Sequence, residues 1–248
     1  MTGQLAQIAR HPIKSHGRES LASVRLTAGE GVPFDRHWAV AHDGAKLVPG
    51  WNPCVNFARG AKAPQLMAIS ARLDDATGTI VLTYPKKPDL TFRPDDADDL
   101  ARFLDWVGPL NPPDRAQPAQ IVTAGRAMTD TEYSSISLIN LASNTALSGV
   151  MGKDLSPLRW RGNLMIDGLD PWAEFDWVGK TLQIGAAVFE VVERITRCRA
   201  TMANPQTGLT DADTLGVLNT TYGHQDFGVY ARVTKGGKIC VGDAVRLI

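Results

Sequence analysis

The chain has 248 residues, 44% of them hydrophobic, which is enough to bury the core of one large domain or two small ones. Lys and Arg together number 26, as do Asp and Glu, and this zero net charge argues against general nucleic-acid or anionic-membrane binding. No apolar run approaches the roughly 18–20 residues of a membrane span, and the first residues lack the pattern of a signal peptide.

Short β-rich runs fill the first half of the chain. Strands are predicted at 5–8, 24–26, 37–41, 67–73 and 80–82. The turn at 74–78 joins the last two as a hairpin. The acidic segment 94–99 suits the first turn of a helix, whose apolar stripe is formed by Leu100, Phe103, Leu104 and Val107. A proline-rich stretch, 109–118, then predicts the linker between two domains, 1–115 and 116–248.

The second half begins with a helix predicted at 141–151. Strands follow at 162–166, 181–184, 188–195, 228–233 and 244–247. Many short strands with few helices predict an α+β, mainly β protein. We expect an N-terminal β-barrel-like domain followed by a C-terminal β-barrel.

Several common functional motifs are missing from the sequence. It holds no Walker A loop, no Gly-x-Gly-x-x-Gly, no His-Glu-x-x-His and no Gly-x-Ser-x-Gly. Three widely spaced cysteines, Cys54, Cys198 and Cys240, form a poor disulfide framework and contain no Cys-x-x-Cys motif. We therefore expect a cytoplasmic protein that binds neither nucleic acid nor a membrane.

Cys198 stands out because three arginines, Arg194, Arg197 and Arg199, lie within five positions of it. Neighbouring positive charge favours the thiolate, the form that attacks electrophiles and binds metals. The following Asn-Pro-x-Thr-Gly turn at 204–208 would direct the strand end into a cleft. A small core thiol with arginines facing solvent is the alternative interpretation, at near-even odds.

Three further segments supply groups suited to an anion. Lys14 and Ser15 follow the first strand and offer an ammonium and a hydroxyl, although they also fit an ordinary surface loop. Arg36 begins a buried-looking strand, where it would pair with a phosphate or with its neighbour Asp35. Arg161 and Asn163 would share one face of a strand. One thiolate with several cationic groups suggests a phosphate-bearing metal cofactor that brings most of its own ligands.

The ordered set of motifs resembles the MOSC-domain family, named after the C-terminal domain of molybdenum cofactor sulfurases. It is most similar to the two-domain branch with a MOSC N-terminal β-barrel, which includes the mitochondrial amidoxime-reducing component and bacterial relatives. The resemblance is carried by segments at 11–15, 35–38, 161–163, 172–179, 197–208 and 241–245.

The resemblance implies that Cys198 is the catalytic residue and the protein's thiolate ligand of molybdenum. It also implies that the molybdenum cofactor, a molybdopterin, is bound by Lys14, Ser15, Arg36, Arg161, Asn163, Arg197 and Ser134. The implied activity is that of an oxidoreductase that reduces N-hydroxylated compounds. Its electrons would come from a separate donor protein, such as a b-type cytochrome, flavodoxin or ferredoxin system. A cofactor-binding or sulfur-carrier protein of cofactor maturation is the alternative, and a β-barrel module that has lost its cofactor is a third.

Overall fold

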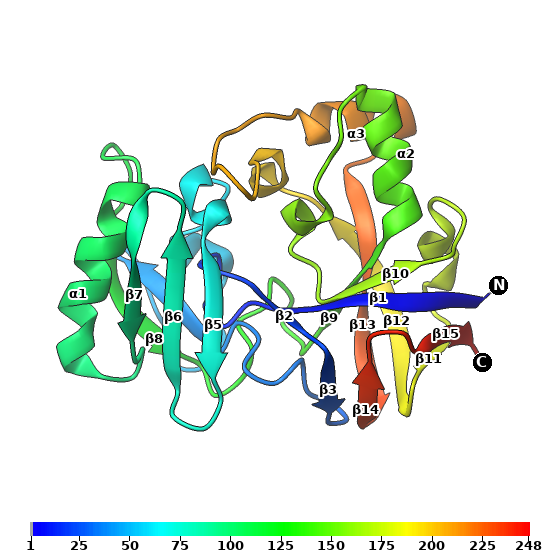
Figure 1. Ribbon diagram of the computed structural model, residues 1–248, viewed down its shortest axis with the longest axis horizontal. Helices are drawn as coiled ribbons and strands as arrows, with labels where there is room; N and C mark the ends of the chain where they lie inside the picture. The colour runs from blue at the N-terminus through cyan, green and yellow to red at the C-terminus, as the bar shows by residue number, and fades with distance from the viewer. Residues whose placement is uncertain (1) are drawn as a thin grey trace.

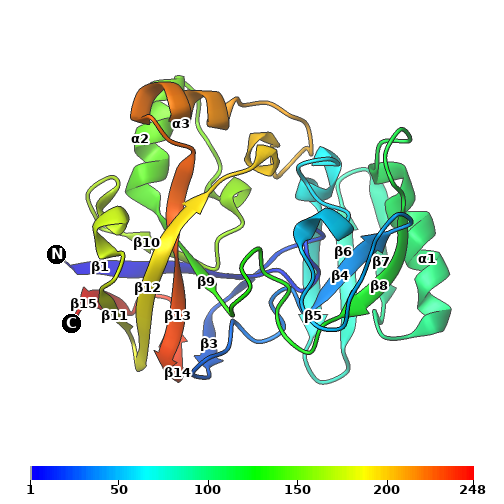
Figure 2. The same ribbon diagram turned by 180° about the vertical axis from the view of Figure 1, so that it is seen from behind.

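The computed structural model describes residues 2–248, which are mostly β with three α-helices. Figure 1 shows two lobes side by side, one formed largely by the first half of the chain and one by the second half. The view from behind in Figure 2 shows the same division. The β-rich α+β class predicted from the sequence is confirmed.

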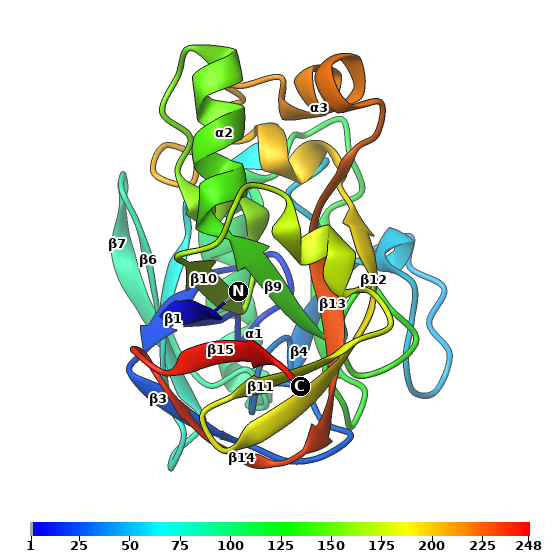
Figure 3. The same ribbon diagram turned by 90° about the vertical axis from the view of Figure 1, so that its right-hand side faces the viewer.

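Seven strands of the described chain close into a barrel. They are β1 (Thr2–Arg10), β9 (Ile136–Asn140), β10 (Leu164–Asp167), β11 (Thr181–Ile184), β12 (Ala187–Thr196), β13 (Asp226–Lys235) and β15 (Ala244–Leu247). Their spatial order is β10-β9-β13-β12-β11-β15-β1, and β1 pairs back onto β10 to complete the ring. Figure 3 shows these strands surrounding a common interior.

The barrel forms because its strands alternate apolar and polar side chains. In β12, Ala187, Phe189 and Val191 are buried, whereas Glu190 between them is exposed. This period of two sends alternate side chains to the interior and to solvent. Strand β1 pairs antiparallel with both β10 and β15, so the start of the chain closes a barrel built otherwise from its second half.

The other lobe packs two small sheets and a helix around a separate core. Its elements are β4 (Trp38–His42) with β8 (Pro118–Thr123), then β5 (Ser70–Asp74), β6 (Thr79–Tyr84), β7 (Lys87–Phe92) and α1 (Ala97–Val107). Asp96 caps α1 by accepting a hydrogen bond from the Asp98 backbone N–H. Phe103 and Val107 bury the apolar face of α1 against the sheet, as its predicted stripe requires.

The remaining elements surround the barrel. They are β2 (Glu19–Leu21), β3 (Ser23–Leu26), β14 (Gly237–Cys240), α2 (Leu141–Met151) and α3 (Thr214–Tyr222). The predicted helix 141–151 is confirmed, with Asn140 as its N-cap and Gly152 in the left-handed conformation after its end. Strand β14 pairs with β3, which draws the beginning and the end of the chain together.

The structure differs from the sequence-based expectations in several local elements. The strand predicted at 67–73 begins only at Ser70, because Pro64 starts a 3-10 helix over Pro64–Ala68. The elements that were not predicted are helix α3 and strands β2, β7, β8, β9 and β14. The predicted division after residue 115 stays a prediction, although β8 beyond it pairs with β4 of the first lobe. Within residues 2–248, none of the helices has the length and apolar character needed to span a membrane.

Candidate functional site

A cavity of about 680 Å³ lies between the two lobes. The first lobe contributes Cys54, Arg59 and Met67 to its wall, and the barrel contributes Cys198 and Tyr230. Cationic side chains predominate in its lining. The cations are Lys14, Arg36, Arg59, Arg159, Arg161, Arg194 and Arg197, and the acids are Asp130, Glu132 and Glu193. Since the molecule as a whole has no net charge, this cationic excess marks the cavity as an anion-binding region.

Most of the cations predicted from the sequence meet in this cavity. Lys14 and Ser15 follow the end of β1, and Arg36 lies just before β4. Arg161 follows η4 (Pro157–Trp160), and Arg197 follows β12 directly before Cys198. Segments far apart in the sequence thus deliver these groups to one place.

The backbone is strained at three of these positions. Five non-glycine residues of the described chain have a positive φ, and three of them line the cavity: Ser15 at 64°, Arg36 at 50° and Arg161 at 49°. A side chain in this left-handed region costs of order 1–3 kcal/mol, and such strain gathers at functional sites. The strain supports a binding role for this wall.

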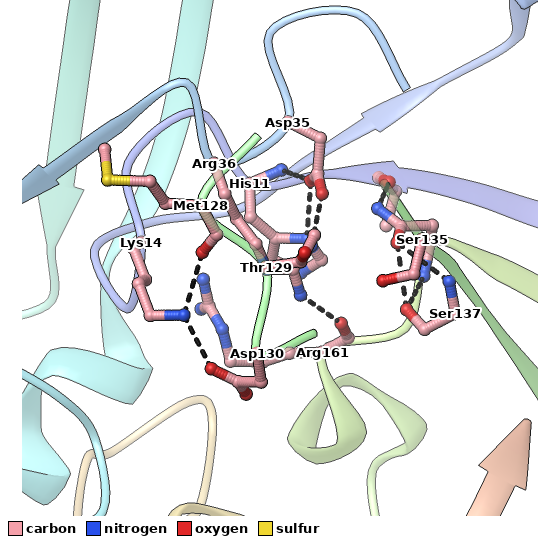
Figure 4. A network of polar contacts seen from close by, with 12 residues as sticks. His11, Lys14, Asp35, Arg36, Met128, Thr129, Asp130, Ser135, Ser137 and Arg161 are labelled. Atoms are coloured by element: carbon pink, nitrogen blue, oxygen red, sulfur yellow. Dashed lines mark hydrogen bonds and ion pairs between the residues drawn. The ribbon is translucent and has the colours of Figure 1, made fainter. Parts of the chain in front are cut away.

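A buried network fixes Arg36 behind the cavity (Figure 4). Asp35 accepts a hydrogen bond from the His11 backbone N–H at 2.7 Å and pairs with the Arg36 guanidinium. Burial alone would raise the pKa of the Asp35 carboxyl, but Arg36 and His11 hold it well below its usual range. Arg36 also donates to the Arg161 carbonyl at 3.0 Å, so the two arginine positions are linked. The Asp35–Arg36 pair left open by the sequence therefore exists, and Arg36 still lines the cavity.

Lys14 is buried, but its carboxylate partner is exposed to solvent. Its Nζ donates to the Met128 carbonyl at 2.8 Å and to the Asp130 carboxylate at 2.6 Å (Figure 4). The Asp130 side chain remains 63% exposed to solvent. Because the Asp130 carboxylate is exposed to solvent, a bound phosphate could replace it at the buried Lys14 Nζ.

Arg161 meets the requirement for an anion more directly. Its Nη2 donates to the Gly17 carbonyl at 3.2 Å, but its Nη1 is buried and has no partner among the described residues. Burial, with Arg36 and Arg18 nearby, lowers the pKa of this guanidinium to about 9. Burial likewise lowers the pKa of Arg197 to about 10, even though the acidic groups around it oppose the shift. The Arg197 nitrogens all donate to the Trp160 and Phe227 carbonyls, which carry no charge. Buried cations without a carboxylate partner are stabilised by an anionic ligand, so the donor set fits a phosphate.

Cys198 completes the site. It follows β12, precedes the 3-10 turn η6 (Arg199–Met202), and is solvent-exposed within the cavity lining. The alternative of a small core thiol is therefore excluded. Among residues 2–248, no group of three or more His, Cys, Asp or Glu side chains is arranged to hold a metal ion. The cavity offers an exposed thiol, Cys198, beside an anion cradle, which fits a metal cofactor that carries its own phosphate.

Two predicted ligands lie elsewhere. Asn163 is buried outside the cavity lining, where its Oδ1 accepts from Ser137 Oγ at 2.9 Å and its Nδ2 donates to the Ala9 carbonyl. The sequence predicted that Arg161 and Asn163 share one face of a strand. They do not, because β10 begins only at Leu164 and Arg161 has a left-handed backbone conformation. Ser134 also lies outside the lining residues. Cofactor contacts by these two side chains stay predictions.

The cavity also contains residues that the sequence did not indicate. They are Cys54, Arg59, Asp130, Ser137, Arg159 and Tyr230. Arg159 stands two positions before Arg161, but a lone arginine in a turn carries no recognisable signal. Tyr230 lies opposite Glu193 in the β12–β13 pairing, and only the strand register reveals that.

Gly162, between Arg161 and Asn163, gives a direct test of this wall. A Cβ built there would lie 2.2 Å from Ile139 Cγ1, and Ile139 is fully buried. We expect Gly162→Ala to lower the free energy of unfolding by about 1–3 kcal/mol through overpacking. Urea denaturation of Gly162→Ala, Ile139→Ala and the double variant would check this. Since Ile139→Ala removes the clashing atoms, the double variant should be more stable than the sum of the single effects; strict additivity would contradict the clash.

Two buried histidines predict how stability depends on pH. Burial, with Arg161 and Arg36 nearby, lowers the pKa of His11 to about 3, and burial lowers that of His16 to about 4. The unfolded chain therefore binds protons below about pH 6.5 that the folded chain does not. Stability should fall as the pH drops from about 6.5 to 4, by up to about 1.4 kcal/mol per pH unit for each histidine.

Urea denaturation at pH 7, 6, 5 and 4.5 would measure this dependence. His16→Gln is the matched variant, because its amide can still donate to the Lys14 carbonyl that His16 Nδ1 contacts at 2.8 Å. We expect this substitution to reduce the slope between pH 6 and 4.5 by about half. A free energy of unfolding that stays constant over that range would contradict the assignment of two neutral, buried imidazoles.

Comparisons with known proteins agree with this arrangement. The family model of the MOSC N-terminal beta barrel domain matches residues 2–108, and that of the MOSC domain matches 126–246. The chain is 24% identical to mitochondrial amidoxime-reducing component 1 of Mus musculus, covering 99% of this chain and 82% of that protein. It is 27% identical to molybdenum cofactor sulfurase of Caenorhabditis elegans, covering 90% of this chain but spanning only 32% of the sulfurase.

Among solved structures, the YUAD protein of Bacillus subtilis aligns over 99% of this chain and 94% of its own, with a TM-score of 0.46 and 11% identity. The two family matches follow one another along the chain, separated by 109–125, and together account for most of the described residues. The chain therefore belongs to the MOSC-domain family, with a MOSC N-terminal beta barrel domain ahead of a MOSC domain.

Proposed function

We propose that the chain binds the molybdenum cofactor in the inter-lobe cavity and reduces N-hydroxylated compounds with electrons from a separate donor protein. One observation carries the proposal: an exposed thiol, Cys198, shares a cavity with buried arginines, of which Arg161 has an unpartnered N–H. A relative along nearly the whole chain carries the name amidoxime-reducing component, which supports this substrate class.

The cavity residues divide into two sets under this proposal. Lys14, Ser15, Arg36 and Arg161 would hold the phosphate of the cofactor, and the sulfur of Cys198, which directly follows Arg197, would be the ligand for the metal. When bound, the cofactor supplies two-electron oxygen-atom chemistry. The arginines bind and orient the anion through planar, bidentate donors.

Reduction of an N-hydroxyl group takes up two electrons and two protons and releases water, so the cavity must hold protons. Burial, together with the negative charge of Asp130, raises the pKa of Tyr230 to about 12. Its phenol oxygen therefore keeps its proton at neutral pH and can donate a hydrogen bond into the cavity. Several of the cations are themselves buried, Lys14 and Arg159 among them, which strengthens their interactions with an anion.

A second function is favoured by the exposure of Cys198 and by the match to the sulfurase. Cys198 could carry a persulfide for cofactor maturation, with the same cradle binding the cofactor in transit. This function needs no reductive turnover, whereas the reductase does.

A single preparation separates the two functions. The protein is expressed in cells that make the cofactor, then supplied with dithionite-reduced viologen and an N-hydroxylated amidine. We expect formation of the amidine in proportion to bound molybdenum. No amidine, with a persulfide on Cys198 that transfers to an acceptor thiol in mass spectrometry, would replace the reductase with the sulfur carrier.

A further inference from the structure

Arg159 is a buried cation whose side-chain hydrogen bonds lead to the segment 201–211, while its Nε has no partner among the described residues. Its side chain is 1% exposed and belongs to η4, two positions before Arg161. Its Nη1 donates to the Thr201 carbonyl at 2.8 Å and to the Ala203 carbonyl at 3.4 Å. Its Nη2 lies 3.3 Å from Asp211 Oδ1. The guanidinium thus spans two backbone carbonyls and one carboxylate.

The turn that Arg159 holds is the one that carries Cys198. The Thr201 backbone N–H and hydroxyl both donate to the Cys198 carbonyl, at 3.2 Å and 3.1 Å. Arg159 therefore contacts the same residue, Thr201, whose N–H and hydroxyl fix the Cys198 backbone. The same turn also lies next to the first lobe. Gly60 of that lobe is so close to Ala200 of the turn that a Cβ added at Gly60 would lie 3.4 Å from Ala200 Cβ.

Asp211 anchors Arg159 from outside the cavity. It also accepts hydrogen bonds from Lys153 Nζ and Asn204 Nδ2, both at 2.9 Å. Burial alone would raise the pKa of Asp211, but Lys153, Asn204 and Arg159 together hold it below its usual value. Asp211 is absent from the cavity lining, so a side-chain change there acts on Cys198 from outside the cavity, through the clamp formed by Arg159, Asp211 and Thr201 and through Asn204.

We propose that Arg159 is a positioning residue that sets where the Cys198 thiol stands in the cavity. The inference rests on the proposed function in assigning Cys198 as the reacting thiol. The planar fork of arginine reaches two carbonyls and a carboxylate together, whereas a lysine keeps the charge but has no fixed fork. The variant Arg159→Lys therefore keeps the positive charge at this site and removes the fixed geometry of its hydrogen bonds.

The first readout uses the protein without cofactor. The rate at which iodoacetamide alkylates Cys198 is measured by peptide mass spectrometry, with Cys240 in the same sample as internal reference. We expect Arg159→Lys and Asp211→Asn each to raise the Cys198 rate at least threefold, because the released turn opens the thiol to the reagent. Arg199→Lys, the same substitution at an exposed neighbour of Cys198, should leave the rate within twofold.

The second readout uses the loaded protein. Both variants should lower kcat for the N-hydroxylated amidine at least tenfold while KM changes less than threefold, since small misplacements of a reacting group affect the chemical step. A purely structural role would lower the yield of folded protein and leave kcat per bound molybdenum unchanged. If Arg159→Lys does not fold, the same two measurements on Asp211→Asn still test the inference.

Each outcome decides the inference. Unchanged alkylation in both variants overturns it, whatever the activity of the wild type. Faster alkylation with unchanged kcat also overturns it and leaves the proposed function intact. Faster alkylation in a protein whose wild type shows no reductase activity supports the clamp and removes the proposed function instead.

Discussion

Replacing Cys198 with serine is expected to lower the rate of N-hydroxyl reduction by on the order of 10³-fold or more, because it removes the exposed thiol that would be the ligand for the metal. The fold should survive. Cys198 is exposed and the exchange of sulfur for oxygen empties no packed space, so the free energy of unfolding should change by less than about 0.5 kcal/mol. Steady-state turnover of an N-hydroxylated amidine, normalised to folded protein, checks the prediction.

Cys240→Ser is the matched control for this experiment. Cys240 lies on β14 and lines no part of the cavity, so its replacement should keep at least half of the activity. Turnover by Cys198→Ser at a rate similar to the wild type would remove Cys198 from the chemistry and favour a different sulfur, such as Cys54 in the same cavity.

Arg161→Met is expected to weaken cofactor binding about 10- to 100-fold, since a hydrogen bond to a charged group contributes about 1.5–3 kcal/mol. The same change should leave the free energy of unfolding of the empty protein equal or raise it by about 1–2 kcal/mol, because replacement of a buried charge by an apolar side chain is often stabilising. Arg161 loses only one hydrogen bond, to Gly17, and its removal relieves repulsion from Arg36 and Arg18. Cofactor retention after gel filtration and urea denaturation measure the two effects.

Arg25→Met tests whether any lost arginine has the same effect. Arg25 is exposed on β3, outside the cavity, and its replacement should alter neither retention nor stability by a measurable amount. A large loss of stability in Arg161→Met, with unchanged cofactor retention, would mean that Arg161 is a structural cation and not a ligand.

These opposite effects on binding and stability follow from the way the cavity is built. Arg36 and Arg161 occupy strained backbone conformations, and the pKa of Arg161 is lowered to about 9 by burial and by neighbouring cations. Such features destabilise the empty protein, and the binding of an anion offsets this loss of stability. A site optimised for stability alone would not concentrate buried arginines around one exposed thiol.

The sequence predicted the fold well where a local pattern determines the element. The ends of helix α2 are marked in the sequence by Asn140, its N-cap, and by Gly152 after its last residue. The apolar stripe of α1 identifies its buried face. Prediction failed where tertiary pairing decides. Strand β7 contains Lys87, Pro88 and Asp89 and becomes a strand through its pairing with β6. No local signal reveals that β1 closes a barrel made from the second half of the chain.

The candidate site divides in the same way. Lys14, Arg36, Arg161, Arg197 and Cys198 were predicted from the sequence, and the structure brings them into one cavity. Asn163 was expected to share the face of Arg161, but the left-handed backbone at Arg161 ends that regularity and the amide joins β1 to the barrel wall instead. Arg159 was missed because its importance depends on contacts with Thr201 and Asp211, more than forty positions away.

The most direct test of the central claim is the molybdenum content of the purified protein, measured by elemental analysis after expression in cells that make the cofactor. Near one molybdenum atom per wild-type chain, with a much lower content in Arg161→Met and an unchanged content in Arg25→Met, is the predicted result. A wild-type chain that carries no molybdenum, from cells in which another molybdenum enzyme is fully loaded, would contradict the claim that this cavity holds the cofactor.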